Sequence, residues 1–166
     1  MIYETQRLII RNLKSTDFIP FHKMNSNEKV MIYTDSPPKS YKEDMQDLQQ
    51  FIDNYSKKEN DFWIWAVERK EDEMFLGNVA IIPFNEGENE VGFRFLEKYW
   101  NNGYGFEAME GLLKYAKQQN YKILYAEVYV KNKASEHILK KLGFRFVNEH
   151  LCKERNLLDR LYKIEF

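Results

Sequence analysis

Apolar residues recur along the chain at strand and helix spacing, and this pattern predicts an alternation of short strands and amphipathic helices. In the first half, helices are indicated after the polar cap residues Ser15–Asp17 and after the break at Ser36-Pro37-Pro38. Two apolar runs joined by the polar turn Arg69–Glu73 predict a β-hairpin. The elements predicted here are a strand at Leu8–Arg11, a helix carrying Phe18, Phe21 and Met24, a helix at Tyr41–Lys57, and strands at Asp61–Val67 and Phe75–Pro83.

The second half predicts a strand, a helix and another strand in succession. Glu90–Phe95 is strand-like, a helical pattern follows and ends near Asn120, and Leu124–Val130 is again strand-like. A single helical crossover makes its two strands parallel, so one parallel pair is expected in the sheet. A shorter helix carrying Ser135, Ile138 and Leu139, with Gly143 as its left-handed stop, and strands at Phe144–Val147 and Leu161–Phe166 complete the pattern. We predict one α/β (α+β) domain over residues 1–166 with a mixed sheet.

Composition narrows the classes of function. With 43% hydrophobic and 31% charged residues, the 166-residue chain has the profile of a folded domain. Its 25 basic and 26 acidic side chains nearly cancel, which argues against nucleic acid or an anionic membrane as partner. The first residues carry no basic and apolar leader, no apolar run approaches ~18 residues, and Cys152 is the single cysteine. We therefore expect a cytoplasmic protein without an internal disulfide.

The segment Trp100–Ala108 places two glycines where a helix begins. Unpaired backbone N–H groups and the positive end of the helix dipole meet there and favour an anion such as a pyrophosphate. A turn that merely needs glycine conformations is the alternative. Gly103, Gly105 and Ala108 also satisfy the dinucleotide fingerprint Gly-x-Gly-x-x-Ala. Against that reading, residues 96–102 separate the glycines from the strand, and only one strand–helix–strand unit is predicted.

Four motifs, in order, carry a resemblance to a known family. They are Glu90-Val91-Gly92-Phe93-Arg94-Phe95, Tyr99-Trp100-Asn101-Asn102-Gly103-Tyr104-Gly105-Phe106-Glu107-Ala108, Asn132-Lys133-Ala134-Ser135 and Lys141-Leu142-Gly143-Phe144. Together they resemble the GNAT acetyltransferases. Within that superfamily the chain is most similar to the Rim-type branch, which includes ribosomal-protein N-terminal acetyltransferases and relatives that act on small amines. The similarity extends from Thr5-Gln6-Arg7-Leu8 to the last strand.

The resemblance implies a mixed, mostly antiparallel sheet in which one parallel pair splays apart to admit acetyl-CoA as co-substrate. It implies that the strand around Phe93 to Leu96 offers backbone groups to the pantetheine arm and that the loop after it wraps the pyrophosphate. The implied cofactor-binding residues are Phe93, Phe95, Leu96, Trp100, Asn101, Asn102, Gly103, Tyr104, Gly105, Phe106, Asn132 and Leu139. Two positions depart from the superfamily pattern. Trp100 replaces its usual Gln or Arg, and Gly105 stands where a small residue is common. In addition, Leu139 replaces the tyrosine that many members use as an acid.

Few side chains are candidates for the chemistry. Glu90 matches an acidic position of the family and is the predicted base, with a salt-bridged strand carboxylate as the alternative reading. Arg94 alternates onto the same strand face, and contact with it would lower the pKa of Glu90 and weaken it as a base. Ser135 is a candidate acid, or simply a small residue packed on the sheet. Asn132 suits both a pantetheine contact and a helix N-cap.

These observations predict an enzyme that transfers the acetyl group of acetyl-CoA to a primary amine by direct attack. Its acceptor is expected to be a protein N-terminal α-amine or a small amine, because an α-amine is partly neutral near pH 7 and a lysine amine is not. A non-catalytic acyl-CoA-binding module of the same fold is the alternative. No metal is expected, since His22, His137 and His150 lie in separate segments. The oligomeric state stays open, with a homodimer among the alternatives.

Overall fold

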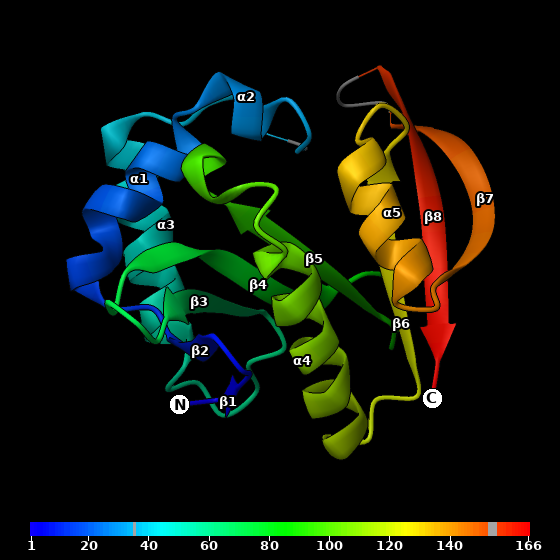
Figure 1. The fold of residues 1–166 in the computed structure, drawn as a ribbon, viewed down its shortest axis with the longest axis horizontal. Coiled ribbons are helices and arrows are strands. Elements are labelled where there is room, and N and C mark those ends of the chain that lie inside the picture. The colour runs from blue at the N-terminus through cyan, green and yellow to red at the C-terminus, as the bar shows by residue number, and fades with distance from the viewer. Residues whose placement is uncertain (35, 153–155) are drawn as a thin grey trace.

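The computed structural model describes residues 1–34, 36–152 and 156–166, in which a single sheet carries helices on both faces (Figure 1). Its strands are β1 (Tyr3–Glu4), β2 (Leu8–Asn12), β3 (Trp63–Arg69), β4 (Phe75–Pro83), β5 (Asn89–Phe95), β6 (Ile123–Tyr129), β7 (Arg145–Cys152) and β8 (Leu157–Glu165). The helices are α1 (Phe18–Asn25), α2 (Glu28–Met31), α3 (Tyr41–Asn54), α4 (Tyr104–Gln118) and α5 (Lys133–Lys141), with short 3-10 turns at Ser15–Asp17 and Glu97–Tyr99.

The strands follow the order β1-β2-β3-β4-β5-β6-β8-β7, and every neighbouring pair is antiparallel except β5 and β6. Helix α4 connects these two parallel strands, as the strand–helix–strand pattern predicted. Their pairing is confined to one bridge, Glu90 opposite Tyr125, whereas β4 and β5 stay paired from Gly77–Phe95 to Pro83–Asn89. Beyond that bridge β5 and β6 diverge, which gives the splayed pair that the resemblance implied (Figure 1).

Alternation along β5 assigns its side chains to two layers. Arg94 reaches Asn25 at the end of α1, so the even-numbered residues of β5 face the layer of α1 and α3. Phe93 lies next to Gly105 in the first turn of α4, so the odd-numbered residues face α4. The buried side chains of both layers form one hydrophobic core, which includes Leu8, Phe21, Trp65, Leu112 and Tyr162.

Two helices have clear start signals, whereas Asp17, one of the residues expected to cap the first helix, is the N-cap of α1 without a side-chain cap hydrogen bond. Ser40 caps α3 in a capping box with Glu43, and Asn132 caps α5 by accepting from the Ser135 N–H at 3.2 Å. Gly143 has φ +91° after α5, which confirms it as the left-handed stop. The apolar stripe Ala108, Met109, Leu112, Leu113 and Ala116 buries one side of α4.

The ends of the chain differ most from the predicted pattern. Strand β1 and helix α2 were not predicted, because each has only two or four residues and depends on its neighbours. Strands β7 and β8 are longer than predicted, since backbone pairing along Asn148–Cys152 and Leu157–Arg160 extends them through polar positions. Residues 1–34, 36–152 and 156–166 contain no helix that combines the length and the apolar character needed to cross a membrane.

Candidate active site

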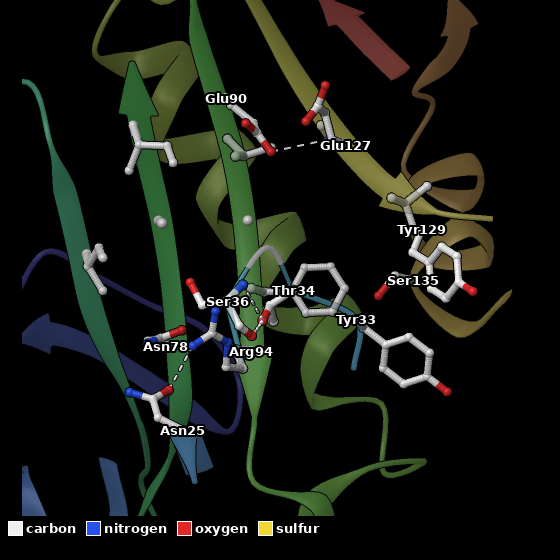
Figure 2. A pocket seen from close by; sticks show the side chains of 18 of the residues that line it. Asn25, Tyr33, Thr34, Ser36, Asn78, Glu90, Arg94, Glu127, Tyr129 and Ser135 are labelled. Atoms are coloured by element: carbon white, nitrogen blue, oxygen red, sulfur yellow. Dashed lines mark hydrogen bonds between the residues drawn. The ribbon is translucent and has the colours of Figure 1, made fainter. Parts of the chain in front are cut away.

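A cavity of about 390 Å³ passes through the sheet between β5 and β6. It is lined by Glu90, Gly92 and Arg94 from one face of β5 and by Val91 and Phe93 from the other. Because consecutive strand residues point to opposite faces, a cavity on one side of the sheet would contact only one of these sets. The opening therefore connects the α1/α3 layer to the α4/α5 layer, and Figure 2 shows β5 and β6 on either side of it.

The backbone of β5 turns hydrogen-bonding groups toward this opening. The Leu96 N–H donates to Leu76 O on β4 at 2.9 Å. Successive residues of a strand direct their backbone groups to alternate edges, so the N–H groups of Phe95 and Phe93 point toward β6. Beyond the bridge at Glu90, β6 is no longer paired with this edge. The strand thus presents backbone N–H donors to the opening at the positions expected to contact the thioester. The N–H of Leu96 is not among them, because it is bonded to Leu76 O.

The loop before α4 has the conformation of an anion-binding helix start. Gly103 is the N-cap with φ +78°, and Asn101 is also left-handed with φ +60°. The Asn102 side chain donates to Trp100 O at 2.7 Å, and the Trp100 indole N–H donates to Phe95 O at 2.9 Å. Residues 100–106 lie outside the cavity lining, at the start of the helix that follows it. The indole therefore anchors the loop to β5, a role that the sequence did not predict.

Two cationic side chains flank this loop. Arg7 donates to Asn102 O at 3.1 Å and to the Glu107 carboxylate in the first turn of α4, and the Lys141 ammonium lies 4.5 Å from the centre of the Phe106 ring. Burial alone would raise the pKa of Glu107, but hydrogen bonds from Thr5 and Arg7 outweigh it and lower that pKa. Glu107 thus stays charged and ties the β1–β2 turn to the loop, beside the predicted pyrophosphate position.

Glu90 lies at the mouth of the opening, where β5 and β6 separate. One carboxylate oxygen is 3.4 Å from the backbone N of Glu127 on β6 (Figure 2). Arg94 shares a strand face with Glu90, and its guanidinium donates to Asn25 Oδ1 at 2.7 Å, on the side away from Glu90 (Figure 2). Asn25 in turn donates to Asp44, whose side chain is fully buried and also bonds His22 Nδ1 at 2.6 Å. The contacts from Arg94 through Asn25 to Asp44 and His22 fix the Arg94 side chain against the α1/α3 layer.

The other predicted catalytic and pantetheine residues come from α5 and its cap. Ser135, Asn132 and Leu139 all line the cavity on the side of the α4/α5 layer. Leu139 is 2% exposed, so at this position the cavity wall is apolar where many family members carry a tyrosine. Asn132 acts as the predicted N-cap through its side-chain oxygen. The figure places Ser135 beside Tyr129 at the edge of the opening (Figure 2).

Sequence spacing did not identify three groups that the sheet brings together. Glu127 on β6, His150 on β7 and Asp159 on β8 are cross-strand neighbours, and His150 Nε2 lies 3.1 Å from Glu127 Oε1. One ligand atom from each lies within 4.8 Å of the others, which within the described residues is the one such group of three or more. Only the register of three strands creates this group, so the sequence, in which these residues lie in separate segments, gave no sign that His150 belongs to a cluster.

Comparison with known proteins defines the family. Residues 7–145 match the family model described as an acetyltransferase (GNAT) domain. The chain belongs to the GNAT acetyltransferase family. This GNAT domain is also 30% identical to YnaD of Bacillus subtilis, which is named an uncharacterized N-acetyltransferase, over 95% of this chain and 92% of the relative. The family match therefore favours an acetyltransferase over a nicotinamide-dinucleotide-binding protein as the interpretation of the glycine loop.

Solved structures share the fold of this GNAT domain. RimL, titled a ribosomal L7/L12 α-N-protein acetyltransferase in complex with coenzyme A, aligns with a TM-score of 0.83 at 14% identity over 99% of this chain and 97% of that one. Spermidine N-acetyltransferase from Vibrio cholerae, in complex with CoA and spermine, aligns with a TM-score of 0.82 at 20% identity over 95% of both chains. At these identities the likeness concerns the fold alone.

Proposed function

We propose that this GNAT domain is an acetyl-CoA-dependent N-acetyltransferase that binds its two substrates from opposite faces of the sheet. The cavity that crosses between β5 and β6 carries the proposal, because it lets an amine and a thioester meet without either passing the other. A structural neighbour, the spermidine N-acetyltransferase from Vibrio cholerae, is titled as a complex with CoA and spermine, which supports a site for a CoA donor and an amine. Acetyl-CoA would enter beside α4 and α5, and the amine would enter from the α1/α3 layer.

The residues of the loop and of β5 would hold the donor. Pyrophosphate would lie on the backbone N–H groups at the start of α4, with Arg7 and Lys141 as flanking cations. The N–H groups of Phe93 and Phe95 would orient the pantetheine arm and stabilise the oxyanion of the tetrahedral intermediate. Asn132 and Leu139 would complete the wall against the arm.

The transfer itself would be a direct displacement. The neutral amine nitrogen attacks the thioester carbon, so an N–C bond forms and the C–S bond breaks. Glu90 would accept the proton that the amine loses, directly or through water, and the thiolate leaves with a proton from Ser135 or from solvent. A thiol pKa near ~8.5 makes the thiolate a tolerable leaving group, so the loss of the family tyrosine at Leu139 does not prevent turnover.

The acceptor class is a primary amine, either a protein N-terminal α-amine or a small amine. Both kinds occur among the structural neighbours, since RimL is titled an α-N-protein acetyltransferase and the Vibrio cholerae enzyme a spermidine acetyltransferase. The motifs of the chain resemble those of the Rim-type branch, and this resemblance would favour these two kinds of acceptor over a lysine side chain.

Replacement of Glu90 tests the mechanism. Glu90→Gln keeps the size and polarity of the side chain and removes its ability to accept a proton, so turnover should fall by roughly a hundredfold while acetyl-CoA affinity stays near normal. The deficit should shrink as pH rises toward the pKa of the amine, because solution then supplies the neutral form. The assay is the release of free CoA with a panel of primary amines from pH 6 to 9, and the matched control is Glu86→Gln, an exposed glutamate in the β4–β5 loop.

Two results would contradict this assignment. Full activity of Glu90→Gln across the pH range would make Glu90 a structural residue. Binding of acetyl-CoA without release of CoA by any amine would favour the alternative of a non-catalytic acyl-CoA-binding module.

A further inference from the structure

Gly92 leaves a hollow in the floor of the cavity on the side of the α1/α3 layer. Its φ lies outside the left-handed region, and a Cβ built on it meets nothing within 4 Å. Gly77 on β4 is the opposite case, because a Cβ there would lie 2.1 Å from Arg94 O. The fold thus requires glycine at Gly77 and does not require it at Gly92. Ala80 is the register partner of Gly92 and also lines the cavity, so two small residues lie side by side beneath it.

One side of this hollow is apolar, and the pair Asn78 and Arg94 gives it a polar side. Ile82 and Ile64 flank Ala80 on the same face of β4 and β3, since Ile64 pairs with Ala80 and Ile82 pairs with Glu90. Phe51 of α3 and Phe62 close the far end, with ring centres 5.9 Å apart in a stacked arrangement. A hydrocarbon or aromatic group placed here exchanges water for apolar contacts, which favours binding by roughly 0.8 kcal/mol for each buried CH₂.

Charge in this part of the cavity does not suit a second ammonium group. The charged side chains that line it, among residues 1–34, 36–152 and 156–166, are Lys39, Asp47 and Arg94. Asp47 forms an ion pair with Lys39. The remaining carboxylates of the lining, those of Glu90, Glu127 and Asp159, lie on β5, β6 and β8 at the other end, where the reacting amine must be. A polyamine reaching across Gly92 would place its distal cation among apolar groups, the Lys39–Asp47 ion pair and Arg94.

Resting on the proposed function, we infer that the acceptor is a small primary amine with one cationic centre on a nonpolar aliphatic or aromatic body. The amine lies near Glu90, and the body crosses Gly92 and Ala80 toward Phe51 and Phe62. Gly92 is then the residue that sets how large this body can be, because any side chain at this position would project into its path.

The experiment measures kcat/KM of the full chain for 2-phenylethylamine, isoamylamine, spermidine and a short peptide with a free α-amine. The wild type should prefer the two nonpolar amines over spermidine and the peptide by about tenfold or more, since a pocket built for one class rejects a charged competitor at least that strongly. Gly92→Val should lower kcat/KM for 2-phenylethylamine by roughly thirtyfold or more and leave the KM for acetyl-CoA within about twofold. Gly92→Ala should give a smaller loss of the same kind.

Folding should not obscure the result. A β-branched residue suits a strand, and the space around Gly92 accepts it, so the thermal unfolding of Gly92→Val should match that of the wild type. Asn89→Val is the matched control, because it adds the same side chain to the same strand outside the cavity lining and should leave all rates unchanged.

The outcomes separate the two claims. A preference for spermidine or the peptide, or unchanged use of 2-phenylethylamine by Gly92→Val and Gly92→Ala, overturns the inference and leaves the acetyltransferase assignment intact. Acetyl-CoA binding without acetylation of any amine by the wild type overturns the proposed function and the inference with it. If the Gly92 variants lose kcat/KM equally for every amine and also lose acetyl-CoA affinity, Gly92 has a structural role, and the inference is overturned as well.

Discussion

Two glycines with the same backbone conformation provide a test of the cofactor loop. Gly103 has φ +78° at the start of α4, and Gly87 has φ +74° in the turn between β4 and β5. A Cβ at Gly87 meets nothing within 4 Å, and one at Gly103 meets Arg7 Nη2 at 3.4 Å, an ordinary contact. Valine at either position therefore meets conformational strain rather than a clash. The strain of a β-branched residue in this region is on the order of 2 kcal/mol.

Both variants should lose stability, and only one should lose affinity. For a chain of this size about 2 kcal/mol corresponds to a fall in Tm of roughly 4–8 °C. Gly103→Val relieves its strain by moving the backbone N–H groups that would hold the pyrophosphate, so we expect acetyl-CoA affinity to fall about tenfold or more. At a concentration that is a hundred times the wild-type Kd, acetyl-CoA then stabilises the wild type by about 2.7 kcal/mol and the variant by about 1.4 kcal/mol.

Thermal unfolding with and without acetyl-CoA measures both effects. The ligand-induced rise in Tm should be normal in Gly87→Val and about half as large in Gly103→Val, while NAD should shift neither protein. If both variants keep the full rise, the loop is a structural turn and the pyrophosphate binds elsewhere. If Gly87→Val loses the rise as well, the effect comes from general destabilisation and the reasoning about the loop fails.

Two further predictions concern α5. Hydrogen bonds from Tyr162, Lys140, Arg160 and Lys133 hold the pKa of the nearly buried Glu136 well below its ordinary value of about 4.5. Because the folded pKa is depressed, the contribution of Glu136 to stability is complete above about pH 4.5 and is lost as pH falls. Glu136→Gln should therefore lower stability by on the order of 2 kcal/mol at pH 7, with a smaller difference from the wild type below pH 4. A difference that stays constant with pH in thermal unfolding would contradict this account. Asn132→Ala should lower stability by about 1 kcal/mol because it removes the cap of α5, whereas Asn132→Ser should keep most of that stability. Equal stability of the two variants in thermal unfolding would refute the capping role. A loss of acetyl-CoA affinity in Asn132→Ser would support the pantetheine contact.

Local sequence determined most of the elements and the start of α4. The helices and central strands follow from apolar spacing, the cap of α5 from the side chain of Asn132, and the end of α5 from the glycine at Gly143. These features depend on interactions between residues a few positions apart, which is why the sequence alone predicts them. The glycine loop belongs to the same class, since Gly103 has the conformation that its position before a helix suggested.

The tertiary structure alone decided the shape of the site. Pairing of β5 with β6 ends after Glu90, and this creates a cavity that crosses the sheet. The hydrogen bond from the Trp100 indole to Phe95 O and the contact between His150 and Glu127 join segments that the sequence pattern treats independently. The hollow at Gly92 likewise depends on how neighbouring strands are placed. Strand register fixes which side chains are neighbours, and register is set by the packing of the whole sheet rather than by any one segment. The sequence therefore determined what each segment would form and much of the cofactor loop, and only the assembled sheet decided where two substrates can meet.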